Sequence, residues 1–165
     1  MEIKKVSRLA MLLALSVILN LIESAFPFFN GVIPGLKIGL ANIVVLFVLY
    51  KYSYKEAILI SLLRVFIIGI LITGLFSVTF WFSLGGALLS SLVMTLFYKT
   101  NKLSIVGISI IGSISHSIGQ VLVAILLLNQ SAMVYYLPWL LLFSIPTGVI
   151  VGLFSQALVN YFKNY

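Results

Sequence analysis

Residues 103–162 are the most constraining feature of this sequence, because they contain no Lys, Arg, Asp or Glu and only His116 as a group that can titrate near neutral pH. At a rise of roughly 1.5 Å per residue, this stretch is far too long for one crossing of a ~30 Å hydrocarbon layer. The polar run Asn129–Ala132 is the natural turn between two crossings. We therefore expect two apolar membrane helices joined by a hairpin.

The rest of the chain has the same character. Hydrophobic residues make up 62% of the 165 residues and charged residues only 8%, whereas a globular domain carries about 25% charged residues. No segment shows the alternating polarity of a membrane β-barrel. The sequence predicts an all-α membrane protein: six helices in a single integral membrane domain that spans residues 1–165. The expected helices cover residues 6–25, 37–50, 54–73, 80–98, 104–128 and 134–162, and the second is short for a span of ~20 residues.

The positions of the basic residues predict the orientation of the chain. With six crossings, only Lys37 falls on the side opposite the termini, while Arg64 lies within a helix. The terminal side receives Lys4, Lys5, Arg8, Lys51, Lys55, Lys99, Lys102 and Lys163. The positive-inside rule then predicts that both termini are cytoplasmic. Because the net charge of +7 is spread over helix ends and forms no single patch, we expect no nucleic-acid partner.

Ionisable groups near the membrane are costly and are therefore candidate functional residues. Glu23 and Lys37 flank the same loop, either as charges that line an outward-facing pocket or as an interfacial pair that anchors the loop. Arg64 lies near the middle of the third helix. Its guanidinium can hold a carboxylate, phosphate or ring carbonyl of a ligand, or it can snorkel or satisfy carbonyls of a neighbouring helix.

The fifth helix carries a polar stripe. Ser113, His116 and Gln120 are spaced i, i+3 and i+7 and so share one face, which either lines a cavity or hydrogen-bonds within helix packing. We expect Asn42 mainly to pack between helices, and we also count it as a candidate substrate-binding residue. Close helix approach is also expected at Gly85, Gly86, Gly107, Gly112 and Gly119. One histidine, three scattered glutamates and no cysteine do not supply a metal ligand set, so no metal or cofactor is expected.

Several ordered segments resemble one family of bacterial membrane proteins. They resemble the Gx transporter family, often labelled heptaprenyl diphosphate synthase component I, and the resemblance spans nearly the whole chain. The segments that carry it are Pro34–Ile43, Lys55–Ala57, Leu63–Val65, Gly85–Leu89, Gly112–His116, Gly119–Gln120 and Tyr135–Pro138. One departure is Ser117, where the family pattern has Asn after the histidine.

The resemblance implies an S component of an energy-coupling-factor (ECF) transporter, a six-helix subunit of the bacterial plasma membrane. In such proteins an Ala-xxx-Ala face of the first helix docks on a shared transmembrane coupling subunit, and separate ATPase subunits hydrolyse ATP. Ala10 and Ala14 match that face. The expected function is capture of an unidentified small molecule for import, with the proline-containing loop of residues 26–36 as a lid. The candidate substrate-binding residues are Glu23, Lys37, Asn42, Arg64, His116 and Gln120.

A second reading stays open at this point. The chain can instead be a non-transporting accessory subunit for isoprenoid, quinone or electron-transfer machinery. We do not expect it to be an enzyme. It has no Walker A run for ATP, and it has neither an aspartate nor a glutamate cluster to bind magnesium diphosphate through hard oxygen ligands.

Overall fold

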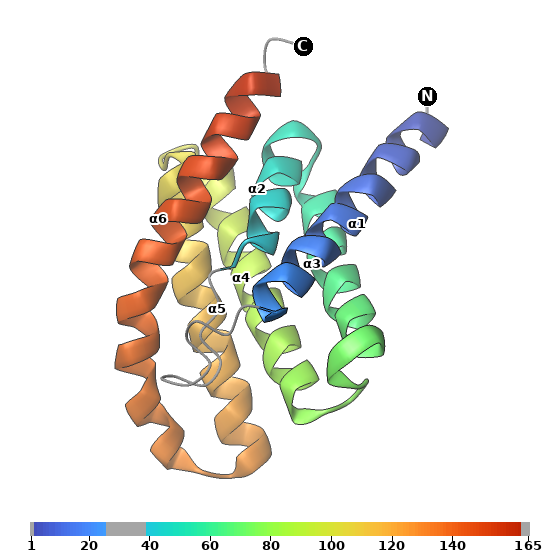
Figure 1. Ribbon diagram of the computed structural model, residues 1–165. Coiled ribbons are helices and arrows are strands. Elements are labelled where there is room, and N and C mark those ends of the chain that lie inside the picture. The colour runs from blue at the N-terminus through green and yellow to red at the C-terminus, as the bar shows by residue number, and fades with distance from the viewer. Residues whose placement is uncertain (1, 26–38, 163–165) are drawn as a thin grey trace.

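Six α-helices account for the apolar segments, and both ends of the chain lie at the same end of the helix bundle (Figure 1). The computed structural model describes residues 2–25 and 39–162. Its α-helices are α1 (Glu2–Ala25), α2 (Ala41–Lys51), α3 (Tyr54–Ile68), α4 (Val78–Thr100), α5 (Ile105–Leu128) and α6 (Leu137–Tyr161). A π-helical turn, Gly69–Thr73, continues α3, and a 3₁₀ helix, Ser131–Tyr136, precedes α6. These ranges contain no strand, and the predicted all-α bundle is confirmed.

Five of the helical segments are long and apolar enough to cross a membrane: Ile3–Ala25, Tyr54–Thr73, Val78–Thr100, Ile105–Leu128 and Ser131–Tyr161. The exception is α2, whose 11 residues extend only about 16 Å at 1.5 Å per residue. It begins at Ala41, later than the expected residue 37. The length and composition of the other five indicate a multi-pass membrane protein.

Short as it is, α2 lies at the centre of the bundle, in contact with α1, α3 and α6 (Figure 1). Seven of its 11 residues are buried. A helix that is apolar on all sides is typically buried on all sides. The largest cluster of buried apolar side chains surrounds α2. Beyond α2 itself, that cluster takes in Ala57, Ile60, Met94, Ile108 and Val151.

Local sequence signals set the helix ends. Ser53, Ser77 and Ser104 precede α3, α4 and α5, and each hydroxyl accepts a hydrogen bond from a backbone N–H of the first turn. Asn101 and Asn129 follow α4 and α5 in the left-handed conformation, with φ of 53° and 50°, which asparagine tolerates better than most residues. The polar run expected to form the turn at residues 129–132 thus begins directly after a helix end.

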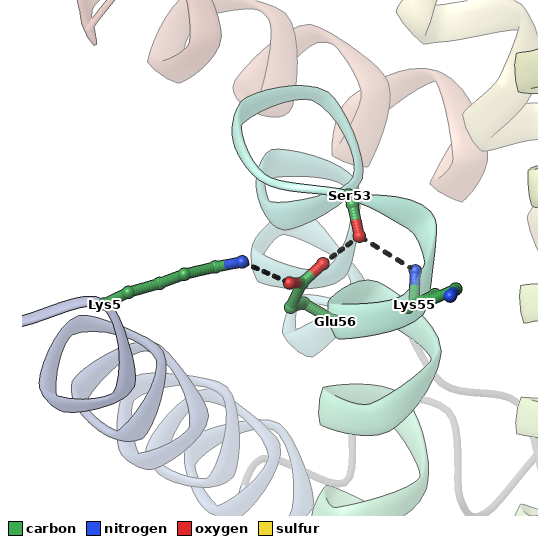
Figure 2. Close-up of polar contacts among 4 residues, drawn as sticks. All are labelled: Lys5, Ser53, Lys55 and Glu56. Carbon is green, nitrogen blue, oxygen red and sulfur yellow. Dashed lines mark hydrogen bonds and ion pairs between the residues drawn. The ribbon is translucent and has the colours of Figure 1, made fainter. Parts of the chain in front are cut away.

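The basic helix ends meet at the end of the bundle that carries the termini. Lys5 of α1 forms an ion pair with Glu56 of α3, whose other carboxylate oxygen accepts a hydrogen bond from Ser53 (Figure 2). The Ser53 hydroxyl accepts in turn from the backbone N–H of Lys55 at 3.2 Å. Because a capping residue and a residue of α1 share the same carboxylate, the start of α3 is tied to the start of α1.

Two further contacts join helices at this end. The Lys51 ammonium at the end of α2 donates a hydrogen bond to the carbonyl of Phe162, just beyond α6. The Lys99 ammonium of α4 lies 4.4 Å from the centre of the Tyr54 ring, a cation–π distance. Lysines from α1, α2 and α4 therefore share one end of the bundle, as the six-helix count predicts.

Glycines let α4, α5 and α6 approach closely. A Cβ on Gly119 would lie 2.5 Å from the Gly85 carbonyl oxygen, and one on Gly112 would lie 2.6 Å from the Met94 sulfur. Gly107 is different: a Cβ there would meet only ordinary contacts, at 3.5 Å or more, with Leu103 and Ser104 of its own turn. The expectation of close helix approach at Gly107 is wrong, because this glycine lies in the first turn of α5.

The α5–α6 contact uses two glycines that the sequence pattern did not single out. A Cβ on Gly148 would lie 2.8 Å from the Ile110 Cα, and one on Gly152 would lie 2.7 Å from the Val106 Cα. Both distances are to backbone atoms, which cannot move independently of the helix. Gly148 and Gly152, four residues apart, therefore set the α5–α6 distance.

Candidate functional site

A cavity of about 70 Å³ lies in the half of the bundle away from the termini. All six helices contribute to its wall, which is unusually polar for an apolar bundle. The polar residues that line it are Asn20, Glu23, Asn42, Arg64, Thr73, Ser83, Ser113, His116, Ser117, Gln120, Ser144 and Thr147. A hollow with convergent polar groups is a feature of small-molecule binding sites.

The structure brings five of the six candidate binding residues to this cavity. Glu23, Asn42, Arg64, His116 and Gln120 all line it. The sixth candidate, Lys37, and the proposed lid of residues 26–36 lie outside the described residues. Residues far apart in the sequence thus share one cavity, while their role in substrate binding stays a prediction.

Arg64 is the most deeply buried charge of the cavity, with 5% of its surface exposed. One terminal nitrogen donates a 3.1 Å hydrogen bond to the Asn42 side-chain oxygen. The guanidinium Nε is buried and has no hydrogen-bond partner among the described residues. Arg64 therefore does not snorkel to the interface, and with five N–H donors in its fork it keeps donors for a ligand.

Asn42 has a more specific role than that of a packing element. It lies in the first turn of α2, and its side-chain oxygen is the acceptor that Arg64 of α3 uses. This side-chain hydrogen bond joins α2 to α3. Asn42 therefore orients the guanidinium toward the cavity that both residues line.

Glu23 binds the start of α2. Its two carboxylate oxygens accept hydrogen bonds from the backbone N–H groups of Gly39, at 2.6 Å, and Leu40, at 3.2 Å. A carboxylate is favourable there because the N-terminus of a helix carries partial positive charge. Glu23 and Arg64 do not approach within the 4 Å of an ion pair, and the only such pair in the described part of the chain is Lys5–Glu56. The expected partner Lys37 lies outside those residues.

His116 and Gln120 face α4 at Gly86. A Cβ on Gly86 would lie 2.8 Å from both Cε1 and Nε2 of the His116 ring and 3.0 Å from the Gln120 Cγ. Glycine at this position therefore leaves the space that the imidazole occupies. These two side chains of the polar stripe on α5 therefore pack against α4 and also line the cavity.

Sequence reasoning missed several residues of the cavity wall. Asn20 lies one turn before Glu23 on α1, and its side-chain oxygen is buried without a hydrogen-bond partner among the described residues. Ser117 of α5 and Ser144 of α6 face each other with their hydroxyl oxygens 2.6 Å apart. The three-residue spacing of Asn20 and Glu23 was a usable signal. Ser117 drew notice only as a departure from the family pattern, and Ser144 gave no signal, because hydroxyls are common in membrane helices.

The chemistry of the wall is that of binding. Arginine and amide N–H groups donate hydrogen bonds, and amide oxygens and hydroxyls accept them. In residues 2–25 and 39–162, no three His, Cys, Asp or Glu side chains lie close enough together to hold a metal ion. The described cavity can thus hold a small polar molecule by hydrogen bonds.

Ala10 and Ala14 lie on the outer surface of α1. Both are exposed, and the large apolar side chains of the same helix, among them Met11 and Ile18, are exposed as well. Only 11% of the membrane-length part of α1 is buried, against 28–39% of the other four spans. The alanine pair therefore does not serve packing within this bundle.

Comparison with known proteins agrees with the resemblance seen in the sequence. The family described as heptaprenyl diphosphate synthase component I matches residues 12–158, which cover most of the bundle. No curated protein and no solved structure matches the chain. The chain belongs to the heptaprenyl diphosphate synthase component I family.

Proposed function

We propose that this chain is the substrate-binding membrane subunit, similar to an S component, of an energy-coupling-factor importer for a small polar molecule. One observation carries the proposal: all six helices place polar groups around a single cavity within an apolar bundle. Ionisable groups inside membrane helices are costly, and where they are present they usually serve a transport or binding pathway.

The wall suggests the class of substrate. The Glu23 carboxylate is engaged by the start of α2, so Arg64 is the charged group with donors left for a ligand. A carboxylate or carbonyl oxygen suits its fork of N–H groups. The volume of about 70 Å³ is below the ~300–1,000 Å³ of sites for drug-sized ligands. The proposed substrate is therefore small and carries a carboxylate or carbonyl group.

The same proposal includes an orientation of the chain in the membrane and a set of partner subunits. Both termini would be cytoplasmic in a bacterial plasma membrane, since the lysine-rich end is the inner one under the positive-inside rule. The cavity would then face outward. Ala10 and Ala14 would dock on the coupling subunit, and ATP would be hydrolysed by separate ATPase subunits, the chain itself having no enzymatic activity.

Retention of a ligand tests the site. Native mass spectrometry would compare the purified protein with Arg64→Gln and with a matched control, Lys102→Gln, which removes one exposed positive charge. We expect a small bound molecule in the parent protein and in the control, and its loss from R64Q. An equally occupied R64Q protein, or a parent protein that carries no small molecule when purified from cells, would contradict the proposed site.

Docking through α1 is tested separately. Ala10→Leu with Ala14→Leu should abolish uptake and co-purification of the coupling subunits, because the larger side chains keep a partner helix from close approach. Ala157→Leu makes the same change at an exposed alanine of α6 and should have no effect. Full uptake by the double variant, with normal expression, would rule out this docking face.

The family description favours one second candidate. A family described as heptaprenyl diphosphate synthase component I is compatible with a non-transporting accessory subunit for isoprenoid, quinone or electron-transfer machinery. Co-purification separates the two: coupling ATPases support the importer, whereas prenyl-transfer or redox proteins support the accessory subunit.

A further inference from the structure

A second hollow lies at the opposite end of the bundle from the polar cavity. It has a volume of about 680 Å³ and opens between α1, α2 and the end of α6. α2 lies between α1 and α6 in the upper half of Figure 1, next to the chain termini. We call this hollow the terminal groove. Most of its wall is apolar, and its only charged groups among the described residues are Arg8 and Lys51.

On both α1 and α2, the groove is lined by one basic residue at its outer end and by apolar residues deeper in. On α1, Arg8 is followed on the same face by Met11 and Leu15; on α2, Lys51 is preceded by Phe47 and Val44. The two helices are antiparallel: α1 leads away from the end of the bundle that carries the termini, and α2 leads back to it. Each stripe therefore has its basic residue at that end and its apolar residues deeper in the bundle. Seven residues at 1.5 Å each carry each stripe about 10 Å deeper.

Both basic groups have donors to spare. Arg8 makes no hydrogen bond or ion pair with any residue that the structure describes, and it is exposed. Lys51 donates to the Phe162 carbonyl, which uses one of its three N–H groups. Two cations on the wall of one largely apolar groove match an amphiphile with an anionic head and a hydrocarbon tail.

We propose that the terminal groove is a binding site for an anionic glycerophospholipid. The phosphate lies between Arg8 and Lys51, and an acyl chain follows the apolar stripes of α1 and α2. Basic pockets between transmembrane helices on the cytoplasmic side bind anionic headgroups in this way. Such lipids are the anionic amphiphiles that the bilayer itself supplies to a groove open to its side.

This site adjoins the alanine face of α1. Successive residues of a helix are turned by 100°, so Ala10 and Ala14 are centred roughly 110° around α1 from the stripe of Arg8, Met11 and Leu15, and Met11 lies at the boundary between the two. The inference rests on the proposed orientation, with the termini cytoplasmic, but not on the proposed transport.

The test is a lipid titration of the purified full-length chain in neutral detergent, followed by native mass spectrometry. The probes are dioleoylphosphatidylglycerol, dioleoylphosphatidylcholine with the same tails, and farnesyl diphosphate. Arg8→Gln with Lys51→Gln removes the groove charges but leaves an N–H donor for the Phe162 carbonyl. The matched control is Lys55→Gln with Lys102→Gln, which removes two exposed charges outside the groove. Leu15→Trp fills the groove and leaves its charges in place.

We expect the parent protein and the control to prefer phosphatidylglycerol over phosphatidylcholine. The groove pair should lose about 10–30-fold in affinity for phosphatidylglycerol, as the interaction of two basic residues with an anionic headgroup implies. Leu15→Trp should lose a similar factor, because the acyl chain is excluded. This result would separate a defined groove from general attraction to a basic surface.

Five results would overturn the proposal. Equal affinity for both lipids, or an equal loss in the groove pair and the control, would show that no charged site exists there. Unchanged binding by Leu15→Trp would exclude the groove as the place of the tail. Tighter binding of farnesyl diphosphate would assign the groove to a prenyl diphosphate. Loss of a co-purifying partner subunit from the groove variants, with lipid binding unchanged, would assign it to a partner helix.

Discussion

The contact between Gly85 and Gly119 allows a quantitative test of the bundle. In Gly119→Ala the new Cβ would lie 2.5 Å from the Gly85 carbonyl oxygen and 3.0 Å from the Gly86 Cα, both backbone atoms of α4. To reach an ordinary contact of about 3.4 Å, α4 and α5 would have to separate by about 0.9 Å. Overpacking of this kind destabilises by about 1–3 kcal/mol.

Helix propensity opposes this effect and supplies the control. Glycine in a helix is about 0.5–1 kcal/mol less favourable than alanine, so G119A should lose up to about 2.5 kcal/mol net. Gly107→Ala makes the same substitution on the same helix without a close contact, and it should be neutral or slightly more stable. The assay is the free energy of unfolding, measured by titration with sodium dodecyl sulfate in mixed micelles. If G119A were as stable as G107A, the close approach of α4 and α5 would be refuted.

Three further changes test other parts of the structure. Gly86→Ala should displace the His116 ring, which can turn away. Ligand retention in native mass spectrometry should therefore fall several-fold, while the free energy of unfolding changes by less than about 1 kcal/mol. Retention equal to that of the parent protein would argue against His116 in the site. Lys5→Ala should lower the free energy of unfolding by about 0.2–1 kcal/mol at low salt and less at high salt, because its ion pair is exposed; an equal loss in Lys102→Ala would speak against the pair. Ser144→Ala removes a hydroxyl pair between α5 and α6, and the same titration should show a loss of about 0.6 kcal/mol, a value near zero being the contrary outcome.

Much of the candidate site followed from chemistry that a single sequence displays. Arg64, His116 and Gln120 are conspicuous because a bilayer makes buried polar groups costly, so few are present by chance. Asn20, Ser83, Ser144 and Thr147 were not found, because a single hydroxyl or amide is inexpensive in a helix and gives no signal until another helix faces it. Glu23 was recognised as important, but its hydrogen bonds to Gly39 and Leu40 depend on how α1 meets the start of α2.

Composition and periodicity by themselves determined that this chain forms apolar helices, roughly where they begin and end, and that the lysines of the described residues share one end of the bundle. These properties depend on local solvation and helix geometry. Tertiary structure alone decided that α2 is a short central helix and that glycines set the α4–α5 and α5–α6 distances. It also decided which polar faces meet around one cavity. The physical reason is that the rotation and spacing of packed helices arise from contacts between distant residues, on which no single segment carries information.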